Sequence, residues 1–84
     1  MTDKSWSVYL VRCKDNSLYC GISNDVQKRV ITHNKGKGAK YTKYRVPVVL
    51  VYCEEIGALG DALRRERQIK NMSKNKKEQM ITCP

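Results

Sequence analysis

Residues 7–23 read SVYLVRCKDNSLYCGIS and carry the clearest structural pattern in the sequence. Its outer segments, 7–13 and 17–23, are rich in the β-branched and aromatic residues that strands favour. The three residues between them, 14–16, are Lys-Asp-Asn, a cluster typical of turns. The pattern predicts a β-hairpin closed by a three-residue loop.

The length of that loop determines which side chains share a face of the hairpin. With three loop residues, Tyr9 lies opposite Gly21 and Val11 lies opposite Tyr19, so that both tyrosines project from one face. A two-residue loop would place the tyrosines on different faces. Gly21 is informative because a glycine inside a strand often marks the close approach of a ligand or of another part of the chain. The alternative is that both rings are ordinary half-buried strand tyrosines.

The segment after the hairpin has the pattern of a helix followed by a loop. We expect a helix over 24–34, with Asn24 as its cap and Gln27 at the reciprocal position of a capping box. Residues 35–45 are rich in glycine and lysine and contain two tyrosines. They predict a basic, exposed loop.

The second half of the chain predicts one strand and two helices. The apolar run 46–55 indicates a third strand in a buried central position, with Pro47 at its start. A helix is expected over 58–72, and Ser73 is placed to cap a short terminal helix over 74–81. The order β-β-α-β-α-α predicts an α+β fold, with a small three-stranded antiparallel or mixed sheet flanked by helices.

Length and composition are those of one small soluble domain. The chain has 84 residues, of which 40% are hydrophobic. No apolar run approaches the roughly 20 residues of a membrane span, and MTDKSW at the start does not resemble a signal peptide. A cytoplasmic protein is therefore expected. The four cysteines form no C-x-x-C pair, so we expect reduced thiols, mostly buried, and no structural zinc site: Cys13, Cys20, Cys53 and Cys83.

The charge balance points to a polyanionic partner. Seventeen Lys and Arg stand against eight Asp and Glu, which gives a net charge of +9 and a pI near 9.6. Nucleic acid is the first choice, because clustered cations release condensed counterions from phosphates. A membrane surface is not expected, because no segment combines a strong apolar face with a basic one.

The stretch GDALRRERQIK, residues 60–70, places Glu66 among three arginines and a lysine. At about 100° per residue, Leu59 and Ala62 lie near the azimuth of Glu66, which predicts a carboxylate in the middle of the apolar stripe. A buried carboxylate must be paired with a cation or bound to a metal. Two interpretations stay open from this helix alone. Glu66 forms a salt bridge with a facing Arg or Lys, or it binds a hard divalent ion such as Mg²⁺.

The first predicted helix contributes Arg29 and His33, which are four residues apart and border the inward side marked by Val26 and Val30. A guanidinium there can clamp a phosphate, and an imidazole can donate to the same phosphate or move protons. The plainer alternative is that Arg29 bonds Asp25 one turn earlier and that His33 closes the end of the helix.

Taken together, these residues resemble the GIY-YIG nuclease family. Residues 7–9 (Ser-Val-Tyr) and 19–21 (Tyr-Cys-Gly) stand where the family has its two triplets. Arg29 and His33 follow, then GKGAKYT in the loop and ALRRERQIK in the later helix. The resemblance covers about residues 6–81, so that residues 1–84 are expected to form a single domain of this kind. It is closest to the small single-domain branch. The serine and the cysteine in the triplets replace a glycine and an isoleucine, and neither supplies catalytic atoms.

The resemblance implies metal-dependent hydrolysis of phosphodiester bonds in DNA. On that analogy Glu66 holds a single divalent ion, Mg²⁺ or Mn²⁺, and Tyr9 helps to activate the attacking water. Tyr19 supports the phosphate or the water by hydrogen bonding, Arg29 neutralises charge on the scissile phosphate, and His33 assists. Because the ordinary pKa of tyrosine is near 10, the role of Tyr9 requires nearby cations or the metal to perturb it.

Substrate binding is expected to rest on the basic loop and on lysines further along the chain. Phosphate contacts of this kind position a nucleic acid but do not read its sequence, so DNA is the first expectation and RNA also fits. Tyr41, like Tyr44, either stacks on unpaired bases or closes the loop over the core. A partner protein is a further expected source of specificity. The expected contact residues are Lys35, Lys37, Lys40, Tyr41, Lys43, Lys70 and Lys74.

The preferred function is therefore a DNA endonuclease acting at flaps, branches or single-stranded regions. The alternatives are a nucleic-acid-binding module without catalysis and an accessory subunit of a DNA repair complex. The presence of Tyr9, Arg29 and Glu66 together favours catalysis over simple binding.

Overall fold

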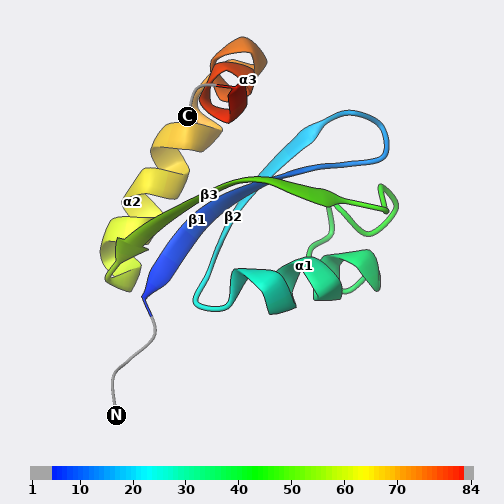
Figure 1. Ribbon diagram of the computed structural model, residues 1–84, viewed down its shortest axis with the longest axis horizontal. Coiled ribbons are helices and arrows are strands. Elements are labelled where there is room, and N and C mark those ends of the chain that lie inside the picture. Colours follow the sequence, from blue (N-terminus) through cyan, green and yellow to red (C-terminus); the bar gives the residue numbers. More distant parts are fainter. Residues whose placement is uncertain (1–4, 83–84) are drawn as a thin grey trace.

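The computed structural model describes residues 5–82 and has the predicted α+β architecture. Three antiparallel strands form one sheet, with α1 on one face and α2 and α3 on the other (Figure 1). In chain order the elements are β1 (Trp6–Arg12), β2 (Leu18–Ser23), α1 (Val26–Asn34), β3 (Val49–Gly57), α2 (Leu59–Lys70) and α3 (Lys74–Thr82).

The hairpin of β1 and β2 has the predicted three-residue loop and register. Tyr9 pairs with Gly21 and Val11 pairs with Tyr19, which confirms that the two tyrosines share a face. A backbone hydrogen bond of 2.8 Å between Cys13 and Ser17 closes the loop. Within the loop Asn16 adopts φ 70°, a left-handed conformation that asparagine tolerates better than most residues.

The central strand of the sheet is β1, in the order β2-β1-β3, and the prediction of a central third strand was wrong. At the start of β3, Val49 and Leu50 remain 61% and 37% exposed, as an edge strand allows. The four residues from Val8 to Val11 are at most 1% exposed, because helices cover β1 on both faces. The shorter apolar run in β1, rather than the longer one in β3, marked the buried strand.

The third strand also begins later than predicted, at residue 49. The side chain of Asn34, at the end of α1, hydrogen-bonds the backbone N–H and carbonyl of the residue just before the strand. The Asn34 side-chain amide donates to the Val48 carbonyl at 3.1 Å, and its oxygen accepts from the Val48 N–H at 2.7 Å. Pro47 precedes the strand in a cis peptide bond. These two hydrogen bonds fix the loop that leads from α1 into β3.

The caps of the helices partly follow the sequence. Asp25, not Asn24, caps α1, and its carboxylate accepts from the Lys28 N–H at 3.2 Å. The expected cap was one residue early because Ser23 accepts from the Asp25 N–H and sets the turn. Ser73 caps α3 as predicted, by accepting from the Lys76 N–H at 3.2 Å.

Alternate residues of β1 divide the interior into two hydrophobic clusters. Val8 and Leu10 face α2, where they pack with Cys20, Ala62 and Ile69. Tyr9 and Val11 face α1 and form the second cluster, which also contains Cys13 and Val48. The thiols of Cys13 and Cys20 are buried and that of Cys53 is exposed, all three free, whereas Cys83 lies outside the described residues.

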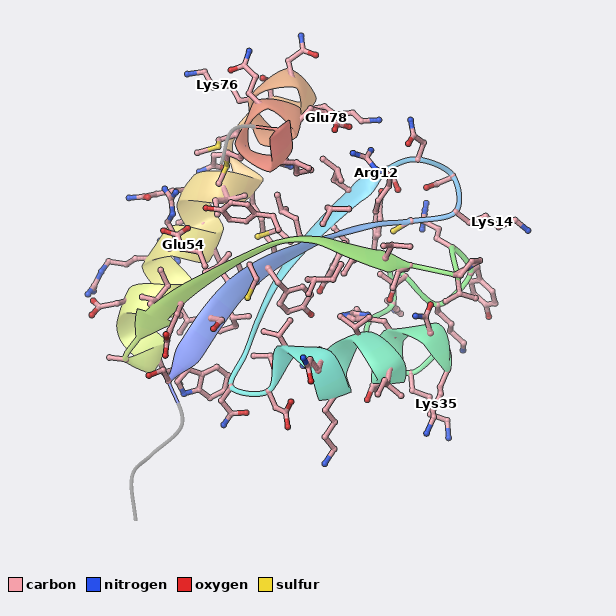
Figure 2. All side chains as sticks on the ribbon, viewed as in Figure 1. Arg12, Lys14, Lys35, Glu54, Lys76 and Glu78 are labelled. Carbon is pink, nitrogen blue, oxygen red and sulfur yellow. The ribbon has the colours of Figure 1, made fainter. Side chains whose placement is uncertain are left out.

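The terminal helix is joined to the hairpin by polar contacts. The Arg12 guanidinium donates to both carboxylate oxygens of Glu78, at 2.9 and 2.6 Å, and Figure 2 shows the two labelled residues beside the hairpin loop. The Lys74 ammonium donates to the Asn16 carbonyl at 3.0 Å. Across residues 5–82, none of the helices is long and apolar enough to cross a membrane.

Candidate active site

A chain of buried hydrogen bonds lies between β1, α1 and the loop after α1. The Tyr9 hydroxyl is 2.7 Å from His33 Nε2, and His33 Nδ1 is 2.8 Å from the Thr42 hydroxyl. The exposed fractions of these three residues are 1%, 0% and 0%. Burial of polar groups is costly unless they are hydrogen-bonded. No buried side-chain nitrogen or oxygen in the part of the chain that the structure describes lacks a partner.

Glycines make room for both rings of this chain. A Cβ atom at Gly21 would lie 2.6 Å from the Tyr9 hydroxyl oxygen and 2.7 Å from its Cζ. A Cβ atom at Gly38 would lie 2.3 Å from His33 Nδ1. Such distances are shorter than carbon contacts allow, so larger residues would displace the two rings. The strand glycine is thus needed for the close approach of Tyr9.

Tyr19 extends the site toward the loop of residues 35–48. Its ring meets the His33 ring edge-on at 5.4 Å and stacks on the Tyr41 ring at 5.7 Å. The Arg45 guanidinium lies 4.1 Å from the centre of the Tyr41 ring. Tyr41 therefore closes the loop over the site, as one of its two interpretations required. Tyr44, in contrast, is 84% exposed.

The pKa values of the two hydrogen-bonded groups move in opposite directions. Burial, reinforced by Tyr19 and opposed by Arg29, raises the pKa of Tyr9 to about 12. Burial, with a further contribution from the Arg29 charge, lowers the pKa of His33 below its ordinary 6.5. At neutral pH both groups are therefore uncharged, and the tautomer of His33 decides which of the two donates the hydrogen bond between them. Desolvation outweighs the nearby cation, so at neutral pH even less of Tyr9 is in the phenolate form than of free tyrosine.

Arg29 lies on the exposed side of α1, one turn before His33. Its charge influences both Tyr9 and His33, which places the guanidinium close to the tyrosine hydroxyl. It also lines a pocket of about 260 Å³ together with Trp6 and Lys28. A guanidinium beside this buried hydrogen-bonded pair has the charge and the paired N–H donors that bind a phosphate.

Glu66 lies on α2, on the other side of the sheet, and not in the middle of the apolar stripe as expected. The buried residues of α2 are Ala62 and Ile69, both 0% exposed, whereas Leu59 and Leu63 are 44% and 47% exposed. Glu66 lies at the margin of this stripe with 18% of its side chain exposed. The position of the sheet, which spacing alone does not give, decides which of the apolar side chains are buried.

The opposite margin of the stripe is occupied by Arg65. Its guanidinium donates to Glu54 on β3 at 3.0 Å. A charged side chain of α2 thus contacts the edge strand β3.

The Glu66 carboxylate is near the site through the edge strand β2. Its charge helps burial to raise the pKa of Cys20, the neighbour of Tyr19, to about 11. The Lys70 ammonium lies 3.3 Å from Glu66 Oε2 and 6.0 Å from the centre of the Tyr19 ring. Because β2 has no strand on its outer side, a side chain from α2 can approach the α1 face around this edge.

Four of the predicted site residues are in contact with one another: Tyr9, Tyr19, Gly21 and His33. The charge of Arg29 lies beside them. Glu66 is linked to Tyr19 through Lys70, which lies near both side chains. Within residues 5–82 no three His, Cys, Asp or Glu side chains gather closely enough to hold a metal ion. A single carboxylate is a poor zinc site. It suits a hard divalent ion that keeps several waters and takes oxygens from the substrate's phosphate.

The predicted nucleic-acid contacts fall in two groups. The loop lysines are exposed and lie in or just before the loop that Tyr41 closes, and Figure 2 shows Lys35 pointing away from the sheet at the end of α1. Lys70 lies at the β2 edge, and Lys74 already bonds the hairpin loop. The exposed loop lysines are Lys35, Lys37, Lys40 and Lys43.

Sequence reasoning missed Thr42 and Gly38, both of which contact His33 directly. Both lie in the segment GKGAKYT, whose composition indicated only a loop. A threonine followed three residues later by an arginine gives no sign of burial. The one available signal of a close approach was the pair of glycines at 36 and 38, since a simple loop does not need two glycines so near each other.

Comparison with known proteins defines the class to which this site belongs. The model of the GIY-YIG catalytic domain matches residues 5–79. The chain therefore belongs to the GIY-YIG family, whose domains form a nuclease superfamily.

Within that family the chain is similar to the UPF0213 proteins. It is 57% identical to a UPF0213 protein of Staphylococcus haemolyticus over 74 residues, which are 88% of this chain and 90% of the relative. A solution NMR structure of a UPF0213 protein from Bacillus halodurans is 41% identical with a TM-score of 0.60, over 93% of this chain and 83% of that one. A solution NMR structure from E. faecalis gives 32% identity and a TM-score of 0.62 with the same coverage.

Proposed function

We propose that this protein is a divalent-metal-dependent endonuclease that hydrolyses phosphodiester bonds in DNA and works as a single domain. The observation that carries the proposal is the 2.7 Å hydrogen bond between the Tyr9 hydroxyl and His33 Nε2, in a site that also contains Tyr19 and is bordered by Arg29. A simple binding surface does not require a buried phenol paired with a buried imidazole.

The pair supplies a proton acceptor for the attacking water. Tyr9, with a pKa near 12, takes a proton from water only if its own proton leaves at the same time. His33 Nε2 is positioned to receive that proton. The water oxygen then attacks phosphorus, the bond from phosphorus to the leaving oxygen breaks, and solvent protonates that oxygen. Tyr9 ends neutral, and His33 ends as an imidazolium.

Glu66 is the residue proposed to hold the metal ion, Mg²⁺ or Mn²⁺. A bound divalent ion stabilises the negative charge that develops on the phosphate oxygens and on the leaving oxygen. The carboxylate needs to exchange its contact with the Lys70 ammonium for that ion, which the exposed position of Lys70 allows. Lys70 then remains as a cation for the nucleic-acid backbone.

Arg29 and Tyr19 are proposed to act on the scissile phosphate. A guanidinium offers two parallel N–H donors to phosphate oxygens, and a phenol at the edge of the site donates one more. Arg29 neutralises charge, while Tyr19 orients the phosphate or the water. Arg29 and Tyr19 lie beside the buried Tyr9–His33 pair, so binding and proton transfer fall to different groups of one site.

The binding surface favours irregular DNA over a long duplex. Exposed lysines supply phosphate contacts without sequence readout, and Tyr44 is the exposed ring available to stack on an unpaired base. We propose flaps, branches or single strands as substrates, and a partner protein as an additional source of specificity. RNA offers the same phosphates and belongs in the test.

The experiment compares the wild type with Glu66→Ala on labelled single-stranded, duplex, flap and branched DNA and on matched RNA, with Mg²⁺, Mn²⁺ or chelator. Glu55→Ala, which removes an exposed carboxylate on β3, is the charge-matched control. We expect wild type and Glu55→Ala to cut DNA only with metal, and Glu66→Ala to bind DNA without cutting it. Binding by all three proteins with no metal-dependent cleavage of any substrate would sink the nuclease proposal.

That second outcome would favour a non-catalytic binding module, in which Glu66 serves only as the ion-pair partner of Lys70. The existing 3.3 Å contact between them is the observation that supports this alternative.

A further inference from the structure

We propose that Thr42 is a positioning residue that fixes the tautomer of His33, so that Nε2 is the free nitrogen that accepts the proton of Tyr9. The proposal rests on the proposed function for its catalytic consequence, although the tautomer itself can be measured without any activity. Thr42 lies in the loop after α1, is 0% exposed, and contacts no atom that would react.

The chain of hydrogen bonds ends at the Ala39 carbonyl, an acceptor that has no proton to donate. The Thr42 hydroxyl lies 3.2 Å from the Ala39 carbonyl and donates to it. A hydroxyl carries one proton, so it must act as an acceptor toward its other neighbour, His33 Nδ1, at 2.8 Å. His33 Nδ1 therefore carries a proton.

The remaining nitrogen follows from the same accounting. A neutral imidazole has one N–H and one free nitrogen, so His33 Nε2 is the acceptor of the 2.7 Å bond from Tyr9. The polarity thus runs from Tyr9 through His33 and Thr42 to Ala39. In the other tautomer, Nδ1 has no proton and must accept a hydrogen bond from the Thr42 hydroxyl. The Ala39 carbonyl would then lose its hydrogen bond from Thr42.

This arrangement also suits the protonated state. When His33 receives the tyrosine proton, Nδ1 remains a donor to Thr42 and Nε2 becomes a donor to Tyr9. Neither ring has to rotate, and Thr42 keeps the same hydrogen bonds throughout. A preorganised acceptor needs no rearrangement during the reaction.

Gly38 restricts the position of the ring from the same loop. Its backbone leaves no room for a Cβ atom, which would lie 2.3 Å from His33 Nδ1. Two residues of the basic loop, Gly38 and Thr42, thus hold His33. The loop that carries the exposed lysines and the buried proton acceptor form one structural unit.

The test begins with NMR of the imidazole nitrogens, which is unambiguous because the chain has one histidine. Spectra are recorded above pH 7.5, where His33 is neutral, for the wild type, Thr42→Ser and Thr42→Val. Serine keeps the hydroxyl, whereas valine replaces it by a methyl group of similar shape. We expect the proton on Nδ1 in the wild type and in Thr42→Ser, and a shift of population toward Nε2 in Thr42→Val. A wild-type proton on Nε2, or a Thr42→Val spectrum with Nδ1 still fully protonated, would overturn the proposal.

Kinetics then test the consequence. We expect kcat of Thr42→Val to fall about 10- to 100-fold with KM unchanged, a part of the roughly 10²–10⁴-fold that a positioned acid or base contributes. Thr42→Ser should restore most of the loss. If the wild type cleaves and kcat of Thr42→Val equals it, the proposal fails while the nuclease function stands. If no protein cleaves, the nuclease function fails, and the NMR result still decides the tautomer.

Discussion

The two faces of the sheet are built from different kinds of side chain, although the same strand supplies both. Toward α2, β1 presents Val8 and Leu10, which pack against Ala62 and Ile69 in a cluster of buried apolar residues. Toward α1, it presents Tyr9, whose hydroxyl bonds a fully buried histidine. The β1 side chains that face α2 contribute only packing, whereas Tyr9 on the α1 face carries a hydroxyl that hydrogen-bonds an imidazole.

This division shows how an 84-residue domain keeps a polar site without losing its core. Apolar burial stabilises the fold by roughly 25 cal/mol for each Å² removed from water. Buried hydrogen bonds add little net stability but cost a great deal when one partner is missing. We therefore expect substitutions of the β1 residues that face α2 to change stability and substitutions of those that face α1 to change activity, and adjacent residues of β1 allow the comparison.

Tyr9→Phe should have the largest effect, on the α1 face. Loss of the hydroxyl removes the proposed proton acceptor, so cleavage should fall by about 10²–10⁴-fold. His33 Nε2 also loses its partner, which costs about 1–3 kcal/mol of unfolding free energy. Cleavage assays and urea denaturation measure the two effects.

Tyr52→Phe is the matched control for that substitution. It deletes the hydroxyl that bonds Glu54 from a tyrosine packed on the α2 face. Cleavage by Tyr52→Phe should remain within twofold of wild type. Equal losses of activity in the two variants would contradict the division between the faces.

Leu10→Ala should have the largest effect on stability. Leu10 is 0% exposed and packs toward α2, and truncation of such a leucine costs about 2–5 kcal/mol. Urea denaturation should show this loss, while kcat measured well below the unfolding midpoint should stay near that of wild type. Leu63→Ala, at a position 47% exposed, should change stability by less than about 0.5 kcal/mol. A fall in kcat for Leu10→Ala similar to that of Tyr9→Phe would show that the faces are coupled.

The difference between the faces also explains how much of the molecule the sequence predicts. The hairpin register followed from a three-residue loop and a period of two, which are local properties of the chain. That register alone placed Tyr9, Tyr19 and Gly21 together. The central position of β1, in contrast, depends on how β3 pairs with it across the sheet, and an apolar run cannot report that.

The candidate site was predictable only as far as residue types suggested its chemistry. Glu66 was noticed because a carboxylate among cations near apolar residues is unusual, but its position at the margin of the buried stripe depends on where the sheet lies. Thr42 was missed because a buried hydroxyl in a basic loop leaves no periodic pattern. Its role follows from three distances that arise in the folded chain.

Acidification should destabilise the protein through the α1 face. The pKa of His33 is lowered in the folded protein by burial and by Arg29, while the unfolded chain titrates near 6.5. Below pH 6.5 the unfolded chain therefore binds a proton at His33 that the folded chain does not bind. The free energy of unfolding falls with pH until the pH reaches the pKa of His33 in the folded protein. The slope is at most about 1.4 kcal/mol per pH unit.

Because His33 is the only histidine, urea denaturation at pH 7.5, 6.5 and 5.5 isolates this contribution. Cleavage should decline only as the pH falls through the lowered pKa of the folded His33, since a protonated His33 cannot accept from Tyr9. His33→Gln should flatten the dependence of stability on pH. A dependence that is equally steep in His33→Gln would assign it to the carboxylates instead.

Lys70→Met should have the smallest effect, at the β2 edge where the two faces meet. Lys70 pairs with Glu66 at 3.3 Å, with 51% of its side chain exposed, and such pairs contribute about 0.2–1 kcal/mol. Without that competing cation, the Mg²⁺ concentration that gives half-maximal cleavage should fall by up to about fivefold. Measurement at saturating DNA separates this effect from the loss of a phosphate contact, which would raise KM for DNA.

Arg64→Met, which removes a cation paired with Asp61 elsewhere on α2, is the control and should leave the Mg²⁺ dependence unchanged. If Lys70→Met requires more Mg²⁺ than wild type, then Lys70 positions Glu66 for the ion and does not compete with it.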